Sequence, residues 1–348
     1  MDLEKGLFGV YNGLEVTEYT LKNNNGMEIK ILSLGAIIRE IIYEDKNRVL
    51  GFDNLDSYVN SSTYMGALVG RVAGRISKGK IEINKTTYEL DKNEGTTCLH
   101  GGNEGFSVKL WELDKENITE DTVGITLKYM SKDLECGFPG DMIIFVRYTL
   151  KNDDTLTIEY FAETNKDTII TLTNHSYFNL NDDHSNNILN HELMIDANEY
   201  IEINESNIPI NISDVENTPF DFRSRKKIDK AMDLTHYQLI NSEGFDHPFI
   251  LKKNSKIPII LSSKKSGIQL SIETTEPVVI LYCSNKIRED LPLLDGTKTF
   301  KYQGVCLETQ WYPDAINQDY LPKNILKPGQ EYYSMTKYMF SVINPNTN

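Results

Sequence analysis

Apolar and other residues alternate with a period of two over much of this 348-residue chain. The clearest case covers residues 144–150, continues through a turn at 151–155, and resumes over 156–162. Alternation of this kind places apolar side chains on one face of a strand, so these residues are predicted to form a β-hairpin. The same pattern recurs at 81–83, at 123–129 and around the turn at 262–267.

Stretches with the 3.6-residue period of a helix are rare, and the strongest of them covers residues 226–239. The 19 tyrosines and 13 phenylalanines suit pleated, half-buried surfaces. Many short strands with few helices predict an all-β fold, either an antiparallel sandwich or a barrel. No Pro- or Ser-rich linker, repeat or low-complexity block divides the chain, so residues 1–348 are predicted to form a single domain.

The chain is acidic, with 36 Lys and Arg against 51 Asp and Glu and a formal net charge of -15. Binding to nucleic acid or to an anionic membrane takes clustered cations, so neither is an expected partner. Residues 1–13 lack the basic and apolar regions of a secretory signal. The four cysteines are far apart and form no CxxC pair. We therefore expect reduced thiols and a cytoplasmic protein.

One segment resembles a phosphate-binding loop, because residues 74–80 match the pattern GxxxxGK. The next residue is Ile81, where a Ser or Thr would hold magnesium, and a strand-like alternation follows in place of a helix. Nucleotide binding is therefore not predicted. His184 and His191 are interpreted as surface polar residues, since they lie among Asn and Asp without the tighter spacing of metal ligands. No metal and no cofactor is expected.

Several polar residues stand in segments suited to a binding site. His100 lies in CLHGG, His175 in TNHSYFN, Asp246 in GFDHP, and Glu308 in VCLETQW. Polar groups that converge with aromatic rings suit a sugar, which presents both hydroxyls and apolar C–H faces. Taken singly, His100 also fits a hydrogen-bonded loop residue, and Glu308 fits an edge-strand carboxylate that faces water. These residues by themselves indicate a sugar or polyol site and leave the reaction open.

Together the segments resemble the aldose 1-epimerase, or galactose mutarotase, family over nearly the whole chain. The matching motifs occur in the family's order: GRVAGRI, CLHGG, ECGFPGDM, LTNHSYFNL, TPFDFR, GFDHPF, TTEP and LETQWYPDA. The resemblance implies a large antiparallel β-sandwich of the galactose mutarotase-like supersandwich type, with the sugar in a cleft across one sheet. It also implies interconversion of the α and β anomers of free aldohexoses such as D-galactose and D-glucose.

The resemblance also implies a role for each matching residue. Glu308, in CLETQ, resembles the general base that removes the proton from the anomeric hydroxyl. His175, in TNHSYFNL, resembles the general acid that protonates the ring oxygen. His100 and Arg75 resemble sugar-binding residues, and Asp246 resembles the carboxylate that holds sugar hydroxyls.

Four further positions are less closely defined by the family's pattern. Tyr177 and Glu276 are expected to contact the sugar. Gly74 belongs to the binding segment but stands where many members have Asn, so a side-chain hydrogen bond is absent there. Trp311 stands where His is common, and it could either stack on the sugar or simply pack.

The chemistry of mutarotation fits these residue types, because ring opening needs one base and one acid and no electron sink, hydride carrier or metal. Ring opening requires Glu308 to be ionised and His175 to be protonated. The acidic groups expected around His175 predict a raised pKa for its imidazole.

Three other functions are possible for a sugar-binding chain of this kind. An epimerase of phosphorylated hexoses needs a second cationic cluster, and only Arg71 and Arg75 stand near each other in the relevant segments. A non-catalytic carbohydrate-binding module needs neither Glu308 nor His175. A glycosidase needs two carboxylates roughly 5–10 Å apart, a distance that a sequence does not contain. The preferred sugar and the choice between monomer and homodimer also stay open.

Overall fold

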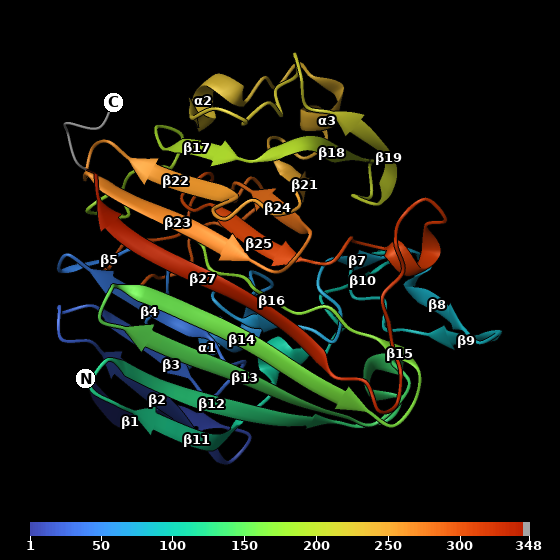
Figure 1. The fold of residues 1–348 in the computed structure, drawn as a ribbon, viewed down its shortest axis with the longest axis horizontal. Helices are drawn as coiled ribbons and strands as arrows, with labels where there is room; N and C mark the ends of the chain where they lie inside the picture. Colours follow the sequence, from blue (N-terminus) through green and yellow to red (C-terminus); the bar gives the residue numbers. More distant parts are fainter. Residues whose placement is uncertain (344–348) are drawn as a thin grey trace.

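The computed structural model describes residues 1–343 and is built mainly of antiparallel β-sheet. The largest sheet has nine strands and crosses the front of the molecule in Figure 1. Its order is β11 (Glu112–Ile118), β12 (Thr122–Ser131), β13 (Met142–Lys151), β14 (Thr155–Thr164), β27 (Tyr332–Val342), β23 (Ile268–Thr274), β22 (Ile259–Ser263), β17 (Glu192–Ile195) and β20 (Lys226–Lys227).

Two five-stranded sheets lie behind the nine-stranded sheet in Figure 1. One contains β1 (Asp2–Tyr11), β2 (Leu14–Lys22), β3 (Glu28–Leu32), β4 (Ile38–Tyr43) and β5 (Lys46–Asn47) in chain order. The other, which we call the site sheet, has the order β19 (Pro209–Asp214), β18 (Ala197–Ile203), β21 (Asp246–Leu251), β24 (Val278–Tyr282) and β25 (Cys306–Gln310).

The predicted hairpin is confirmed as β13 and β14, where Tyr148 pairs with Ile158. Alternate residues of β13 are buried, because one face of the strand packs against the other layer. A single hydrophobic core includes side chains from all three large sheets, among them Ile31, Val146 and Leu307. The fold is therefore the large antiparallel β-sandwich that was predicted, and burial of these apolar side chains is the main force that holds its layers together.

The α-helices in the described part of the chain are few and short: α1 (Leu55–Asn60), α2 (Ile228–Ala231) and α3 (Tyr237–Ile240). The helical stretch predicted at 226–239 is thus two separate short helices. Asp233 interrupts it, because its carboxylate accepts hydrogen bonds from the Thr235 amide and hydroxyl and so favours a turn. Within residues 1–343, none of the helices is both long and apolar enough to cross a membrane.

Small two-stranded ladders bring the motif segments toward the site sheet. β7 (Arg75–Ile76) pairs with β10 (Cys98–Leu99), and β16 (Thr173–Asn174) pairs with β6 (Leu68–Val69). The segment that resembles a phosphate loop continues directly into the hairpin of β8 (Lys80–Ile83) and β9 (Thr86–Glu89). The strand-like alternation predicted after this segment is therefore confirmed.

The interpretation of His184 and His191 as surface residues is wrong, since both side chains are buried. His184 Nδ1 lies 3.1 Å from Asp295 Oδ2, and His191 Nε2 accepts a hydrogen bond from the Leu180 amide at 2.9 Å. The polar neighbours of these histidines suggested an exposed loop, but the loop packs against segments that are distant in the sequence.

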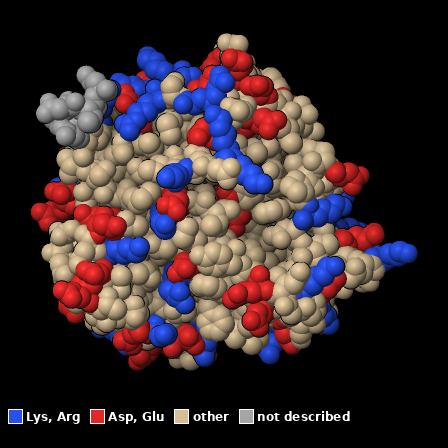
Figure 2. All heavy atoms as spheres, in the orientation of Figure 1, with Lys and Arg blue, Asp and Glu red and all other residues tan. Residues whose placement is uncertain are grey.

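Both acidic and basic side chains are scattered over the face shown in Figure 2, with uncharged surface between them. The four cysteines are free thiols, as expected, and three of them are buried.

Candidate functional site

A cavity of about 630 Å³ opens over one face of the site sheet. Its floor comes from alternate residues of neighbouring strands, because side chains at i and i+2 of a strand point to the same face. Pro248 of β21 pairs with Ile280 of β24, which in turn pairs with Glu308 of β25. Asp246 and Tyr282 extend this floor by the same alternation.

The cavity brings together seven of the eight residues predicted for the site, drawn from separate segments of the chain. These are Gly74, Arg75, His100, His175, Tyr177, Asp246 and Glu308.

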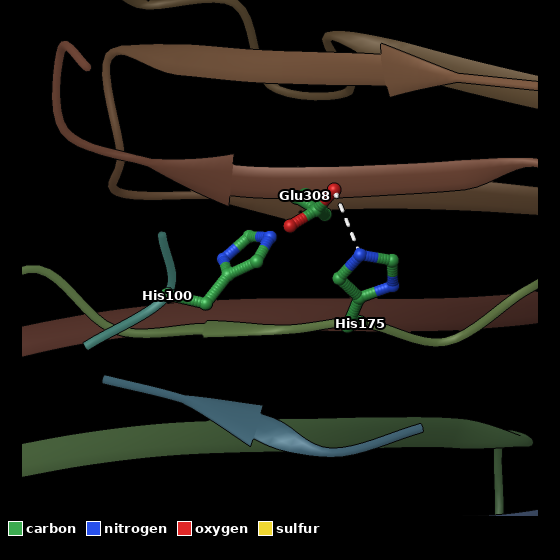
Figure 3. A group of neighbouring side chains, drawn as sticks. All are labelled: His100, His175 and Glu308. Atoms are coloured by element: carbon green, nitrogen blue, oxygen red, sulfur yellow. Dashed lines mark ion pairs between the residues drawn. The ribbon is translucent and has the colours of Figure 1, made fainter. Parts of the chain in front are cut away.

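Glu308 occupies the middle of β25 and is only 3% exposed. Its Oε1 lies 3.6 Å from His175 Nε2, the contact drawn as a dashed line in Figure 3. Its Oε2 is buried and has no hydrogen-bond partner within the described chain. Buried polar atoms are nearly always paired, so this oxygen is available to a ligand. Burial, aided by the nearby Asp246, raises the pKa of Glu308 to about 8, although Arg75 opposes the shift.

His175 directly follows β16, and its amide donates a hydrogen bond to the Ala67 carbonyl at 2.9 Å. Its ring stacks on Tyr177 with centroids 5.0 Å apart, and its Nδ1 lies 3.5 Å from Cys306 Sγ. Burial lowers the pKa of His175 to about 4. The expectation of a raised pKa is therefore wrong, because loss of water around the ring outweighs the opposing effect of a backbone hydrogen bond.

The segments that carry His175 and Glu308 are joined through their backbones. The Phe178 amide donates to the Val305 carbonyl at 2.8 Å, and the Val305 amide donates to the Phe178 carbonyl at 2.9 Å. We call this pair of hydrogen bonds the Phe178–Val305 bridge. It lies three residues from His175 and three from Glu308, and so it sets the separation of the imidazole and carboxyl groups.

His100 approaches Glu308 from the side opposite His175 (Figure 3). It begins a sharp turn in which His100, Gly101 and Gly102 all have positive φ. A Cβ on Gly101 would lie 1.9 Å from the Gly70 carbonyl oxygen, so glycine is required at this position. The turn places His100 beside Gly74, whose carbonyl accepts from the His100 amide at 3.0 Å.

Hydrogen bonding also defines the tautomer of His100. The Gly74 amide donates to His100 Nδ1 at 3.2 Å, so the ring hydrogen of the neutral form resides on Nε2. Burial, together with His175 and Arg75, lowers the pKa of His100 well below its usual value. His100 is therefore a neutral hydrogen-bond donor.

His100, His175 and Glu308 have possible metal-ligand atoms within 4.8 Å of one another. A metal on His100 Nε2 would need the ring hydrogen on Nδ1, where it would meet the Gly74 N–H group. The hydrogen bonding of His100 consequently fits a donor to a sugar oxygen and conflicts with a metal ligand.

Arg75 connects two acidic residues on the wall of the cavity. Its Nε and Nη2 donate to the Glu94 carboxylate at 2.6 and 2.9 Å, and its Nη1 lies 3.6 Å from Asp246 Oδ2. Asn207 Nδ2 also donates to Asp246 Oδ2, at 2.8 Å. Burial alone would lower the pKa of Arg75, but Asp246 and Glu94 raise it overall. Sequence reasoning missed Glu94 and Asn207, which lie outside the quoted motifs.

Aromatic residues shape the remaining wall. The Tyr177 hydroxyl donates to the Thr63 carbonyl at 2.9 Å, which leaves the ring to support His175. Tyr64 and Tyr282, which the sequence analysis did not single out, also line the cavity. Trp311 is outside the cavity lining, and its Nε1 donates to the Pro322 carbonyl at 2.8 Å. Of the two roles considered for Trp311, the structure therefore shows packing.

Glu276 is the predicted contact that the structure does not bring to the cavity. It lies in the turn between β23 and β24 and accepts a hydrogen bond from the Tyr332 hydroxyl at 3.3 Å. The prediction is wrong because the turn directs this carboxyl toward β27, away from the cavity. Burial raises the pKa of Glu276 from 4.5 to about 7.

Replacing Glu276 with Gln is expected to change how stability depends on pH. The folded chain binds the Glu276 proton more tightly than the unfolded chain does. The stability that this proton adds to the folded state is therefore fully present below pH 4.5 and is lost as pH rises through about 7. Glutamine does not titrate, so the variant does not lose this stability. The unfolding free energy of Glu276→Gln minus that of the wild type should therefore increase by roughly 2–3 kcal/mol from about pH 4.5 to about pH 8. Urea denaturation at several pH values measures this gain, and a difference independent of pH would contradict it.

A β-sandwich whose cavity combines buried ionisable groups with aromatic and hydrogen-bonding walls fits an enzyme that acts on carbohydrates. Comparisons with known proteins agree with this class. The family model described as aldose 1-epimerase matches residues 17–339. The chain belongs to the aldose 1-epimerase family, isomerases that interconvert the anomers of aldoses.

Individual relatives are similar over almost their full length. Galactose mutarotase of Mus musculus is 38% identical over 339 residues, which is 95% of each chain. Aldose 1-epimerase of Haemophilus influenzae is 33% identical over 97% of this chain and 99% of its own. The crystal structure of galactose 1-epimerase from Lactobacillus acidophilus superimposes with a TM-score of 0.90, 26% identity and 99% coverage of both chains.

Proposed function

We propose that this aldose 1-epimerase acts on free aldohexoses such as D-galactose and D-glucose, with Glu308 and His175 as its acid–base pair. The observation that carries the proposal is the unpartnered Oε2 of Glu308 in a cavity where Oε1 lies 3.6 Å from His175 Nε2. The names of the relatives support galactose as a substrate.

Between about pH 4 and pH 8 the two groups together hold one proton, and burial places it on Glu308 in the resting site. Transfer of this proton to His175 Nε2 produces the reactive carboxylate and imidazolium. The positive charge of Arg75 favours the ionised carboxyl. The pair thus supplies both a base and an acid without drawing a proton from solvent.

Ring opening then follows from general acid–base catalysis. Glu308 removes the proton of the C1 hydroxyl, while His175 protonates the ring oxygen and the bond between C1 and that oxygen breaks. The resulting open-chain aldehyde rotates about its C1–C2 bond, and the reverse proton transfers close the ring on the other face. The two residues therefore exchange roles between opening and closure.

The remaining residues hold the sugar during rotation. His100 donates through Nε2, Arg75 donates through the N–H groups that Glu94 leaves free, and Asp246 accepts from hydroxyls. Fixed hydrogen bonds to the rest of the substrate keep the aldehyde near the pair.

We also propose that residues 1–348 act as one domain, as a monomer or homodimer, on small sugars rather than on nucleic acid or membranes. The shared core of the three large sheets supports one domain, and the free thiols suit a reducing cytoplasm.

Polarimetry of freshly dissolved α-D-galactose and α-D-glucose tests the proposed function. The purified protein, dialysed against EDTA, should accelerate the change in optical rotation well beyond the spontaneous rate, and heat-denatured protein should not. Absence of acceleration with both sugars would reject the proposed substrates. Loss of activity on dialysis and recovery with zinc would reject the metal-free mechanism.

A further inference from the structure

The Arg75 guanidinium is already occupied by a carboxylate. Glu94 accepts from both Nε and Nη2, at 2.6 and 2.9 Å, in the bidentate arrangement that arginine offers to planar anions. The Thr97 hydroxyl donates to Glu94 Oε2 at 3.2 Å and helps to hold it in place. Glu94 itself lines the cavity and is partly exposed, so the ion pair forms part of the wall that a sugar contacts.

The cavity lining carries further charged groups. Asp246 lies 3.6 Å from Arg75 Nη1, and Glu205 adds a further acidic group at the rim. The second cation among the lining residues is Lys286, which is exposed and donates to the Asn241 carbonyl at 2.8 Å. Acidic groups therefore outnumber cations in the described cavity lining.

We propose that Glu94 determines specificity, because it occupies the bidentate face of Arg75 and so restricts the cavity to aldoses without an anionic group. This inference rests on the proposed function and adds a substrate class to it. A carboxylate or phosphate on the sugar must displace Glu94 or remain unpaired beside Glu94 and Asp246, and an unpaired charge in a partly desolvated site is costly. An uncharged hexose needs only single hydrogen bonds from the remaining N–H groups of Arg75.

Substitution of Glu94 by Gln is the direct test, with D-galacturonate as the anionic probe and D-galactose as its uncharged counterpart. Glu94→Gln keeps the size of the side chain and frees the guanidinium for the sugar carboxylate. Glu205→Gln is the matched control, because it removes the same charge from the same cavity without a contact to Arg75. Isothermal titration calorimetry of both sugars measures affinity without requiring turnover.

In Glu94→Gln, the affinity for galacturonate relative to galactose should rise at least about tenfold, or roughly 1.4 kcal/mol. Glu205→Gln should change this ratio by less than about twofold, since rim charges are screened by solvent. Adding Arg75→Lys to Glu94→Gln should abolish the gain, because lysine lacks the planar fork. Glu94→Ala provides a second variant, and thermal unfolding verifies that each variant is folded.

An unchanged ratio in both Glu94 variants would overturn the inference, as would an equal rise in Glu205→Gln, which would show an effect of net charge alone. These outcomes are separate from a failure of the proposed function. If the proposed function is wrong, the wild-type protein will not accelerate galactose mutarotation, and this result does not depend on the ratios of sugar affinities.

Discussion

Glu308→Gln should lower kcat for galactose mutarotation by about 10²–10⁴, the usual contribution of a positioned acid or base. Glutamine keeps the shape of the side chain but cannot accept the proton of the C1 hydroxyl. Galactose affinity should remain within about tenfold, because the wall formed by Arg75, His100 and Asp246 is unchanged. Polarimetry measures turnover, and calorimetry measures binding.

The matched control is Glu276→Gln, which converts another buried glutamate to its amide outside the cavity. It should keep near wild-type turnover. Near-normal turnover in Glu308→Gln would show that Glu308 is not the base. An equal loss of turnover in the control would show that the loss is not specific to Glu308, and the assignment of the base would then fail.

His175→Asn should reduce kcat by a similar factor and change the shape of the pH profile. For the wild type, kcat/KM should be bell-shaped, with limbs near pH 4 and pH 8, because the pair carries its single proton only between these values. At lower pH both groups are protonated and no base is present, and at higher pH both are deprotonated and no acid is present.

Without His175, the residual activity depends only on ionisation of Glu308. The rate of His175→Asn should therefore rise through the pKa of Glu308 and show no decline on the alkaline side. Initial rates of rotation across the pH range, corrected for the spontaneous reaction, measure both profiles. An alkaline decline that persists in the variant would identify another group as the acid, with His100 the nearest alternative.

The sequence predicted the architecture well because strand alternation is a local property. The hairpin at 144–162 follows directly from which residues are apolar, and the structure reproduces it. Most of the residues predicted for the site do line the cavity, and they could be named because they stand in contiguous motifs such as CLHGG and CLETQ. Their convergence in one cavity depends on the pairing of β24 with β25 and on the small ladders, which no single motif contains.

The errors concern properties that only packing determines. The pKa of His175 depends on how completely the surrounding layers remove water, and that burial reversed the expected direction of the shift. Glu276 lies in a recognisable motif, but the direction of its carboxyl depends on the turn between two strands. Glu94 was missed because its importance comes from a contact with Arg75 across a loop, for which the chain has no periodic or motif signal.

β25 is the terminal strand of the site sheet, so its outer edge would otherwise expose amide and carbonyl groups that can pair with another chain. At the Phe178–Val305 bridge, the segment that carries His175 pairs with the backbone directly before β25 and so starts to cover this edge. The same backbone contacts thus have two effects. They fix the position of the His175 imidazole relative to the Glu308 carboxyl, and they protect the edge strand against pairing with another copy of the chain. An engineer who widens the cavity by loosening this segment should expect aggregation to appear together with the loss of turnover.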